Sequence, residues 1–174
     1  MEPMPTARKR VRTAVLDGKL YVAGGRVNDE GHGATASLGE RYDLATKAGE
    51  AVAPMATPRE SHAVAVLDGK VYAVGGCSDG VGHLSSVERY DPAANAWEAV
   101  APMAAERDHH AVAALDGKMY AVGGFNTDFL SSVERYDPAL DVWEAVAPLG
   151  TARYNHGVAM LDGKLYAVGG RNGD

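Results

Sequence analysis

Cysteine is nearly absent from this sequence, and long hydrophobic runs are missing. The chain has 174 residues and one cysteine, Cys77, which excludes an internal disulfide and favours a reducing compartment. No stretch approaches the roughly 18 apolar residues that a membrane-spanning helix needs. No signal-peptide core follows the basic residues at positions 8–12. We therefore expect a cytoplasmic protein without a membrane partner.

Positive charge is also in short supply. The 17 lysines and arginines are outnumbered by 23 aspartates and glutamates, which gives a formal net charge of −6. A protein of this charge is not expected to bind the phosphate backbone of a nucleic acid. Aromatic residues make up only 7% of the chain, but hydrophobic residues reach 46%. That fraction is enough to build a buried core in a chain of this length.

The sequence repeats along its whole length. Leu-Asp-Gly-Lys begins at positions 16, 67, 115 and 161, which are 51, 48 and 46 residues apart. A Gly-Gly pair follows at positions 24, 75, 123 and 169, and Glu-Arg-Tyr-Asp begins at positions 40, 88 and 134. Ala-Pro followed by Met or Leu closes the units at positions 53, 101 and 147. Such spacing indicates an array of similar supersecondary units.

Each unit is predicted to contain four short strands. In the second unit these are residues 62–67, 70–76, 87–91 and 97–101. The first is small and apolar throughout, which favours a strand buried on both faces. Asp68-Gly69 between the first two strands is a strong signal for a two-residue hairpin. Pro92 and Pro102 are expected to end the third and fourth strands. With the hairpin and the short connections, this predicts an antiparallel four-stranded unit.

The motifs of this unit resemble the kelch repeat along its whole length. They are Arg59, His62-Ala63-Val64, Asp68-Gly69-Lys70, Gly75-Gly76, Val87-Glu88-Arg89-Tyr90-Asp91, Trp97 and Ala101-Pro102-Met103. The sequence looks most like the kelch domain of BTB-kelch (kelch-like) adaptor proteins. The resemblance implies an all-β protein, a β-propeller whose four-stranded antiparallel blades place their first strands at the central channel. The predicted kelch region is 1–174, with blades at about 11–55, 61–103 and 109–149 and a partial blade at about 155–170.

About three and a half blades are predicted, so the chain is expected to be a fragment of a propeller. A closed propeller typically has four to eight blades, and open blade edges invite pairing with another strand. One alternative is self-association of two copies through these edges. Two copies would not complete the half blade, because both lack the same third and fourth strands. We therefore favour a fragment of a longer product over a closed dimer.

The loops differ on one face of the predicted propeller. In an antiparallel blade with strands a, b, c and d, the b–c and d–a loops share a face, and the a–b and c–d turns share the other. The distance from Gly-Gly to the next Glu-Arg-Tyr is 15, 12 and 10 positions, whereas the distance from that Glu to the next Leu-Asp-Gly is always 27. Every insertion therefore lies in a b–c loop. Insertions in repeat arrays often mark the binding face.

The candidate ligand-binding residues are those on this face that do not repeat in register. They are Arg10, Arg26, Asn28, Ser61, His109, Phe125, Asn126, Phe129, Tyr154, Asn155 and Arg171. In BTB-kelch proteins, arginines at such loop positions engage acidic peptides, and the resemblance carries this role over to Arg10, Arg26 and Arg171. Phe125 and Phe129 are aromatic residues of the kind that form interface hot spots. The alternatives are an ordinary solvated loop surface, or phenylalanines that fold back onto the blade.

The residues that do repeat are predicted to build the scaffold. Arginines precede the first strand at positions 8, 59, 107 and 153, and glutamates recur at 40, 88 and 134; we expect them to pair. The Gly-Gly pairs are expected to allow close backbone packing, because no helix follows to form a phosphate site. Histidines at 62, 110 and 156 are expected to make strand-end hydrogen bonds. A ring of metal ligands is the less favoured alternative.

We expect a module that binds a protein or peptide ligand and is not an enzyme, with no catalytic residue, metal or cofactor. The resemblance suggests substrate recognition for a cullin-type ubiquitin ligase adaptor, or actin binding. The alternative is an enzyme on the same scaffold, of the copper oxidase or sugar epimerase type. A copper radical site needs a Tyr–Cys crosslink with added histidine ligands, and no histidine is closer in sequence to Cys77 than His83. No paired carboxylates or Ser/His/Asp set stands outside the repeat register.

Overall fold

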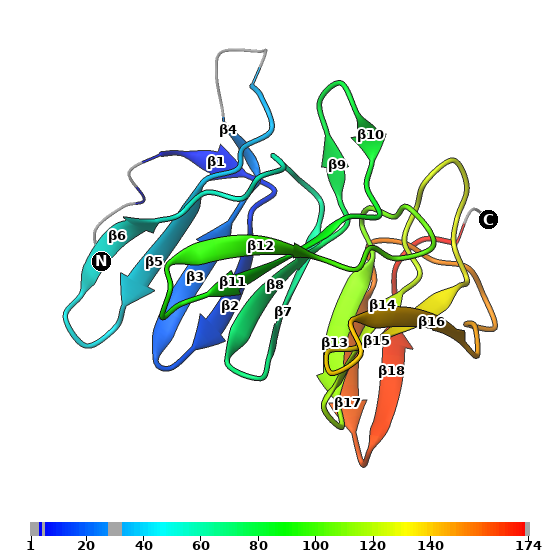
Figure 1. The fold of residues 1–174 in the computed structure, drawn as a ribbon. Helices are drawn as coiled ribbons and strands as arrows, with labels where there is room; N and C mark the ends of the chain where they lie inside the picture. Colours follow the sequence, from blue (N-terminus) through cyan, green and yellow to red (C-terminus); the bar gives the residue numbers. More distant parts are fainter. Residues whose placement is uncertain (1–3, 5, 28–32, 173–174) are drawn as a thin grey trace.

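The computed structural model describes residue 4 and residues 6–27 and 33–172. Over these residues the chain is all β, with three four-stranded antiparallel sheets and the two-stranded sheet of β17 (Gly157–Leu161) and β18 (Lys164–Val168) arranged side by side around an arc (Figure 1). Two further two-stranded sheets, β1 (Arg8–Lys9) with β4 (Arg26–Val27) and β9 (Cys77–Ser78) with β10 (Gly82–His83), lie in the loops. Each four-stranded sheet is one blade, and its strands follow one another in sequence order. Among the described residues, no helix is long and apolar enough to span a bilayer.

The strands of the blades recur at the spacing of the sequence motifs. The first blade contains β2 (Arg12–Leu16), β3 (Lys19–Ala23), β5 (Gly39–Asp43) and β6 (Ala48–Val52). The second contains β7 (Ala63–Leu67), β8 (Lys70–Val74), β11 (Val87–Asp91) and β12 (Ala96–Val100), and the third contains β13 (Ala111–Leu115), β14 (Lys118–Val122), β15 (Val133–Asp137) and β16 (Val142–Val146). The two-stranded unit consists of β17 (Gly157–Leu161) and β18 (Lys164–Val168).

A two-residue turn joins the first two strands of each unit. Asp68 and Gly69 both have positive φ angles, of 49° and 69°, as a type I′ turn requires. Leu67 pairs with Lys70 directly across the turn. The hairpin predicted from Asp-Gly is therefore confirmed, and it sets the register in which the apolar residues of β7 and β8 face one another.

The innermost strand of each blade lies at the propeller axis. β7 contacts β2 on one side and β13 on the other, and β13 also contacts β17. The prediction that this strand is buried on both faces is wrong in part. Leu67 is buried, but Val64, Ala65 and Val66 are only half-buried, because β7 is an edge strand of its sheet and borders the central channel.

The hydrophobic core lies between neighbouring sheets. Tyr72 of the second blade and Tyr136 of the third are buried with their ring centroids 5.8 Å apart, and Met119 packs in the same cluster. Trp97 reaches across to the first blade, where its indole Nε1 donates to the carbonyl oxygen of Ala53 at 2.9 Å. Apolar burial and an indole hydrogen bond therefore hold adjacent blades together.

Repeated arginines and glutamates join the strands within each blade, as predicted. The guanidinium of Arg59 donates to the carboxylate of Glu88 at 2.7 Å and to the carbonyl of Gly75 at 2.8 Å. Both charged side chains are almost completely buried. Glu88 in turn accepts from the backbone N–H groups of Ala56 and Thr57. Arg107 and Glu134 make the equivalent ion pair in the third blade, so the carboxylate holds the incoming loop as well as the arginine.

The Gly-Gly pairs allow two blades to approach closely. A Cβ atom at Gly75, where φ is +57°, would lie 2.6 Å from the carbonyl oxygen of Arg107 and 2.9 Å from the His110 ring. The expected close-packing role is therefore confirmed. The strand-end hydrogen bond expected for the histidines is wrong for His62 and His110, whose ring nitrogens have no partner among the described residues. Packing over a glycine, and not polar pairing, explains why these histidines repeat.

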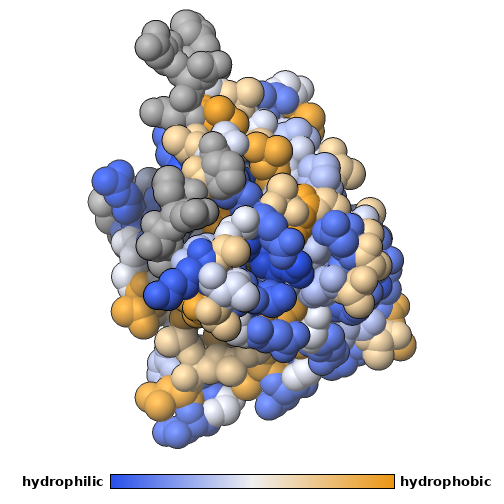
Figure 2. Space-filling view, turned by 90° about the vertical axis from the view of Figure 1, so that its left-hand side faces the viewer, coloured by the Kyte–Doolittle hydropathy of each residue, from blue (hydrophilic) through white to orange (hydrophobic). Residues whose placement is uncertain are grey.

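The two ends of the arc expose hydrophobic side chains. Tyr166 and Val168 of β18 are 44% and 65% exposed, whereas the equivalent Tyr72 and Val74 are 1% and 0% exposed. At the other end, Val15 is 63% exposed. Figure 2 shows the side of the molecule formed by the first blade, where hydrophobic and hydrophilic residues are interspersed. Self-association through these edges stays a prediction.

Candidate functional site

The d–a and b–c loops meet on one face, as predicted. β1 (Arg8–Lys9), in the loop before the first blade, pairs with β4 (Arg26–Val27) of the first b–c loop. The same position is occupied in later blades by the bridges between Glu60 and Cys77, Asp108 and Phe125, and Tyr154 and Arg171. The short hairpin of β9 (Cys77–Ser78) and β10 (Gly82–His83) projects from the same face (Figure 1).

A left-handed residue follows each of these bridges. Arg10, Ser61, His109 and Asn155 all have φ angles between 49° and 55°. The backbone N–H of His109 donates to the carbonyl of Ser61, and that of Asn155 donates to the carbonyl of His109, both at 2.9 Å. The side chains directly before Ser61, His109 and Asn155 contact the preceding blade. Three such side chains, those of Glu60, Asp108 and Tyr154, build the site.

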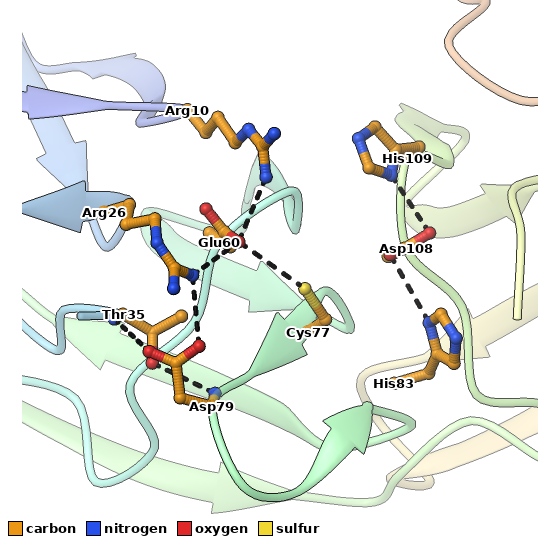
Figure 3. A network of polar contacts seen from close by, with 9 residues as sticks. All are labelled: Arg10, Arg26, Thr35, Glu60, Cys77, Asp79, His83, Asp108 and His109. Carbon is orange, nitrogen blue, oxygen red and sulfur yellow. Dashed lines mark hydrogen bonds and ion pairs between the residues drawn. The ribbon is translucent and has the colours of Figure 1, made fainter. Parts of the chain in front are cut away.

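Glu60 lies in a network of charged groups (Figure 3). Its carboxylate accepts from Arg10 at 3.1 Å and from Arg26 at 3.0 Å, and its own side chain is only 4% exposed. Arg26 also pairs with Asp79 at 3.1 Å. The backbone N–H of Thr35 lowers the pKa of Asp79, and Arg26 acts in the same direction. Two of the predicted ligand-binding arginines are therefore already paired with carboxylates of the chain.

Cys77 lies between this network and the next blade. Its Sγ is 3.9 Å from Oε1 of Glu60. Burial raises the pKa of the thiol to about 11, and the negative charges of Glu60 and Asp108 add to the effect. Because the thiolate is the nucleophilic form, Cys77 is not a reactive thiol at neutral pH.

An aromatic pocket lies beside the network, on the third blade. The ring centroid of Phe129 is 5.3 Å from that of Tyr154 and 5.7 Å from that of Phe125. His83 and His109 complete the wall, with Phe125 and Tyr154 as their nearest rings. Together with Asp108 these side chains line a cavity of about 310 Å³. The phenylalanines therefore form a concave surface and do not fold back into the blade core.

Asp108 is the buried acid of this pocket. The residue is 5% exposed, and its carboxylate lies 3.0 Å from Nδ1 of His109 and 3.4 Å from Nδ1 of His83 (Figure 3). Its Oδ1 has no hydrogen-bond donor of acceptable geometry in the part of the chain that the structure describes. A buried carboxylate without a lysine or arginine partner is unusual, because burying an unpaired charge is unfavourable.

The other predicted residues differ in their suitability. Ser61 is 1% exposed, so its side chain does not reach the surface and we leave it out of the site. The side-chain oxygen of Asn126 accepts from the backbone N–H groups of Thr127 and Asp128, so Asn126 shapes the loop. Asn155 and Arg171 are exposed. Asn28 lies outside the described residues.

The repeated histidines His62 and His110 are buried. Burial lowers the pKa of both well below the ordinary value of 6.5, so both rings are neutral near pH 7, which is also the form of imidazole that binds metal ions. Among the described residues, no group of three or more His, Cys, Asp or Glu side chains is placed to hold a metal ion.

Comparison with known proteins decides the family. The profile of the KLHDC2/KLHL20/DRC7 Kelch-repeats domain family matches residues 1–170. The chain belongs to this kelch-repeat family. The resemblance seen in the repeat motifs is therefore confirmed, and so is the kelch-type propeller fold.

Two curated relatives share part of the sequence. The Influenza virus NS1A-binding protein homolog of Xenopus laevis is 43% identical over 76 residues, and Kelch-like protein 33 of Homo sapiens is 36% identical over 87 residues. These segments make up 44% and 50% of this chain but only 11% and 16% of the relatives. The chain is also similar to the solved structure of YjhT, with a TM-score of 0.83 and 19% identity over 94% of this chain and 59% of that one. This last similarity shows a shared fold.

Sequence reasoning missed three residues of the site. Glu60, Asp108 and His83 were not among the candidates, although Glu60 and Asp108 are in the loops chosen as the binding face. The available signal was their position directly after the repeated arginines Arg59 and Arg107. Lysine, glutamate, aspartate and tyrosine follow the four arginines in turn, so this position varies while its neighbour does not.

Proposed function

We propose that this kelch-repeat chain binds a protein or peptide ligand through the face formed by its b–c and d–a loops, and that it is not an enzyme. The observation that carries the proposal is the aromatic pocket of Phe125, Phe129 and Tyr154. These rings do not repeat in register. They are half-buried around an open cavity, as is typical of interface hot spots.

The charged network beside the pocket extends the same surface. Arg10 is exposed and Arg26 half-buried, but both already pair with Glu60. An acidic ligand would therefore compete with Glu60 and Asp79 for these guanidinium groups. Arg171 is exposed and makes no ion pair among the residues described, which makes it the more available of the three arginines.

The finer role rests on the relatives. Kelch-like protein 33 shares 36% identity with half of this chain, which supports substrate recognition for a cullin-type ubiquitin ligase adaptor. Such a role requires a cullin-binding domain in the same assembly. Actin binding is the other role suggested by the resemblance, and co-sedimentation with filamentous actin distinguishes it from peptide capture.

The experiment is selection of random displayed peptides on the immobilised chain. The affinity of the enriched peptides is then measured by fluorescence anisotropy for the wild type, for a double variant of the pocket and for a control variant. We expect the double variant Phe129→Ala, Tyr154→Ala to bind at least tenfold more weakly than the wild type. The matched control is Leu140→Ala, which truncates a side chain 70% exposed on the c–d turn of the same blade. Equal loss in both variants, or no loss in the double variant, contradicts the proposed face.

A further inference from the structure

The three side chains that precede the left-handed residues contact the preceding blade. Two of them, Glu60 and Tyr154, contact the same two positions of the preceding blade, namely its left-handed residue and the residue that follows its Gly-Gly pair. Glu60 meets Arg10 and Arg26 there. Tyr154 meets His109 and Phe125, at ring distances of 6.1 Å and 6.0 Å. The first and third blades thus present the same two positions to the side chain of the following loop.

Asp108 differs from Glu60 in the charge of the residues at these two positions. In the second blade the two equivalent positions are held by Ser61 and Cys77, and the charge of Asp108 acts on the Cys77 thiol. Both residues are uncharged, whereas those at the equivalent positions around Glu60 are two arginines. Asp108 is as deeply buried as Glu60, at 5% against 3% exposed. Asp108 therefore lies at the position equivalent to Glu60 but has no arginine at the two positions that Arg10 and Arg26 hold around Glu60.

The space beside Asp108 is open and lined with aromatic rings. Phe125, Phe129 and Tyr154 surround a cavity of about 310 Å³ that Asp108 also lines. Aromatic faces attract cations, and a guanidinium group can stack on a ring while it donates to a carboxylate. The flanking groups His83 and His109 approach Asp108 through Nδ1, and neither supplies a guanidinium group.

We propose that this pocket binds a cationic side chain, lysine or arginine, of the protein partner, with its charged group on Asp108 and its stem packed against the rings of Phe129 and Tyr154. The ligand cation takes the place that Arg10 and Arg26 hold at Glu60. This inference rests on the proposed function, because it names the ligand chemistry of that binding face. It is opposite in charge to the acidic peptide that the resemblance implies for Arg10, Arg26 and Arg171.

The test uses three small probes and backbone amide chemical shifts. Nα-acetyl-arginine methylamide and Nα-acetyl-lysine methylamide carry the cation, and Nα-acetyl-citrulline methylamide is the neutral analogue of the first. We expect saturable shifts at Asp108, Phe125 and Phe129 with at least one cationic probe, and at least tenfold weaker binding of citrulline. The ratio of the two cationic probes identifies which side chain the pocket prefers. Equal affinity for arginine and citrulline, or no saturable shift with either cation, overturns the proposal.

Two variants test the carboxylate. Asp108→Asn keeps the shape and removes the charge, so we expect at least tenfold weaker binding of the preferred cation. Cys77→Arg keeps Asp108 and supplies the missing guanidinium at the position equivalent to Arg26, so we expect the same loss. Glu106→Gln is the matched control, because it removes an exposed charge two residues away. Unchanged cation binding in Cys77→Arg overturns the proposal even where Asp108→Asn fails to fold.

The outcomes separate this inference from the proposed function. If the binding of selected peptides depends on Phe129 and Tyr154 but the peptides show no preference for lysine or arginine, the binding face is supported and the cation site is contradicted. If their binding depends on neither aromatic residue, the binding face itself is contradicted.

Discussion

Arg59 and Glu88 form an ion pair of 2.7 Å in which the two side chains are 0% and 4% exposed. The pair joins the start of the first strand to the third strand of the same blade, and the carboxylate also accepts from two backbone N–H groups. These bonds join the second blade to the loop that enters it, so the pair is a structural element of the repeat. The arginines of the candidate site, by contrast, pair with acids of the next blade.

Removing one partner of this buried pair is expected to destabilise the fold strongly. Glu88→Gln leaves the Arg59 guanidinium buried without its counter-charge, and such losses lower the free energy of unfolding by about 3–5 kcal/mol. The matched control is Glu98→Gln, whose carboxylate pairs with Arg89 on an exposed face, where about 0–1 kcal/mol is expected. Urea unfolding of the two variants measures the difference. Similar losses in both would mean that Glu88 is not structurally special.

The first glycine of the Gly-Gly pair is expected to tolerate no side chain. Gly75→Ala adds a Cβ that would lie 2.6 Å from the Arg107 carbonyl at a φ of +57°. Gly69→Ala has a similar φ of +69° but meets nothing within 4 Å. The second variant therefore reports the left-handed backbone alone, about 1–2 kcal/mol, and the first should lose about 1–3 kcal/mol more from overpacking. Thermal unfolding of both proteins checks this order, and a reversed order refutes it.

Acid is expected to destabilise the chain through the buried histidines. Burial lowers the pKa of His62 and His110 well below 6.5 in the folded state. The unfolded chain therefore takes up protons first as the pH falls below about 6.5, and stability is lost in that direction. Each histidine contributes a slope of up to about 1.4 kcal/mol per pH unit. Urea unfolding between pH 7.5 and 5 measures the slope, and His110→Gln should reduce it; a slope unchanged by this variant contradicts the assignment.

The single cysteine is expected to react slowly in the folded protein. With its pKa raised to about 11, Cys77 holds little thiolate at pH 8, so alkylation by iodoacetamide should be at least tenfold slower than for an ordinary thiol of pKa about 8.5. Mass spectrometry follows the reaction without ambiguity, because the chain has no other cysteine. The rate should rise after unfolding in urea. A folded-state rate equal to the unfolded one would mean that neither burial nor Glu60 suppresses the thiolate.

The sequence predicted the scaffold well because the scaffold repeats. Asp68-Gly69 defines a hairpin locally. Each of the four repeated arginines precedes its Gly-Gly pair by 16 positions, which places Arg59 and Gly75 in one register, and the glutamate at the position of Glu88 recurs in three units. The third strand of the second blade was placed correctly at Val87–Asp91, and the fourth was shifted by one residue to Ala96–Val100. Local patterns are sufficient for such elements, since every blade packs the same residue types at the same strand positions.

The site was harder to predict because its contacts cross between blades. Arg26 and Glu60 are 34 positions apart, and no local pattern shows that the glutamate neutralises the arginine. The surroundings of Asp108 were hard to predict for the same reason, since the equivalent positions, Ser61 and Cys77, belong to the preceding blade. The prediction for the histidines was wrong for a different reason. A buried polar residue was expected to make a hydrogen bond, but the His62 ring packs over Gly24.

Hydrogen exchange with a bound peptide tests whether the ligand binds at the aromatic pocket. The peptide of highest affinity from the displayed library is added to the chain, and amide exchange is compared with that of the free protein. We expect slower exchange in residues 104–110, 124–130 and 152–156, where the d–a and b–c loops surround the pocket. Slower exchange confined to the c–d turns, around Leu140, would contradict this expectation.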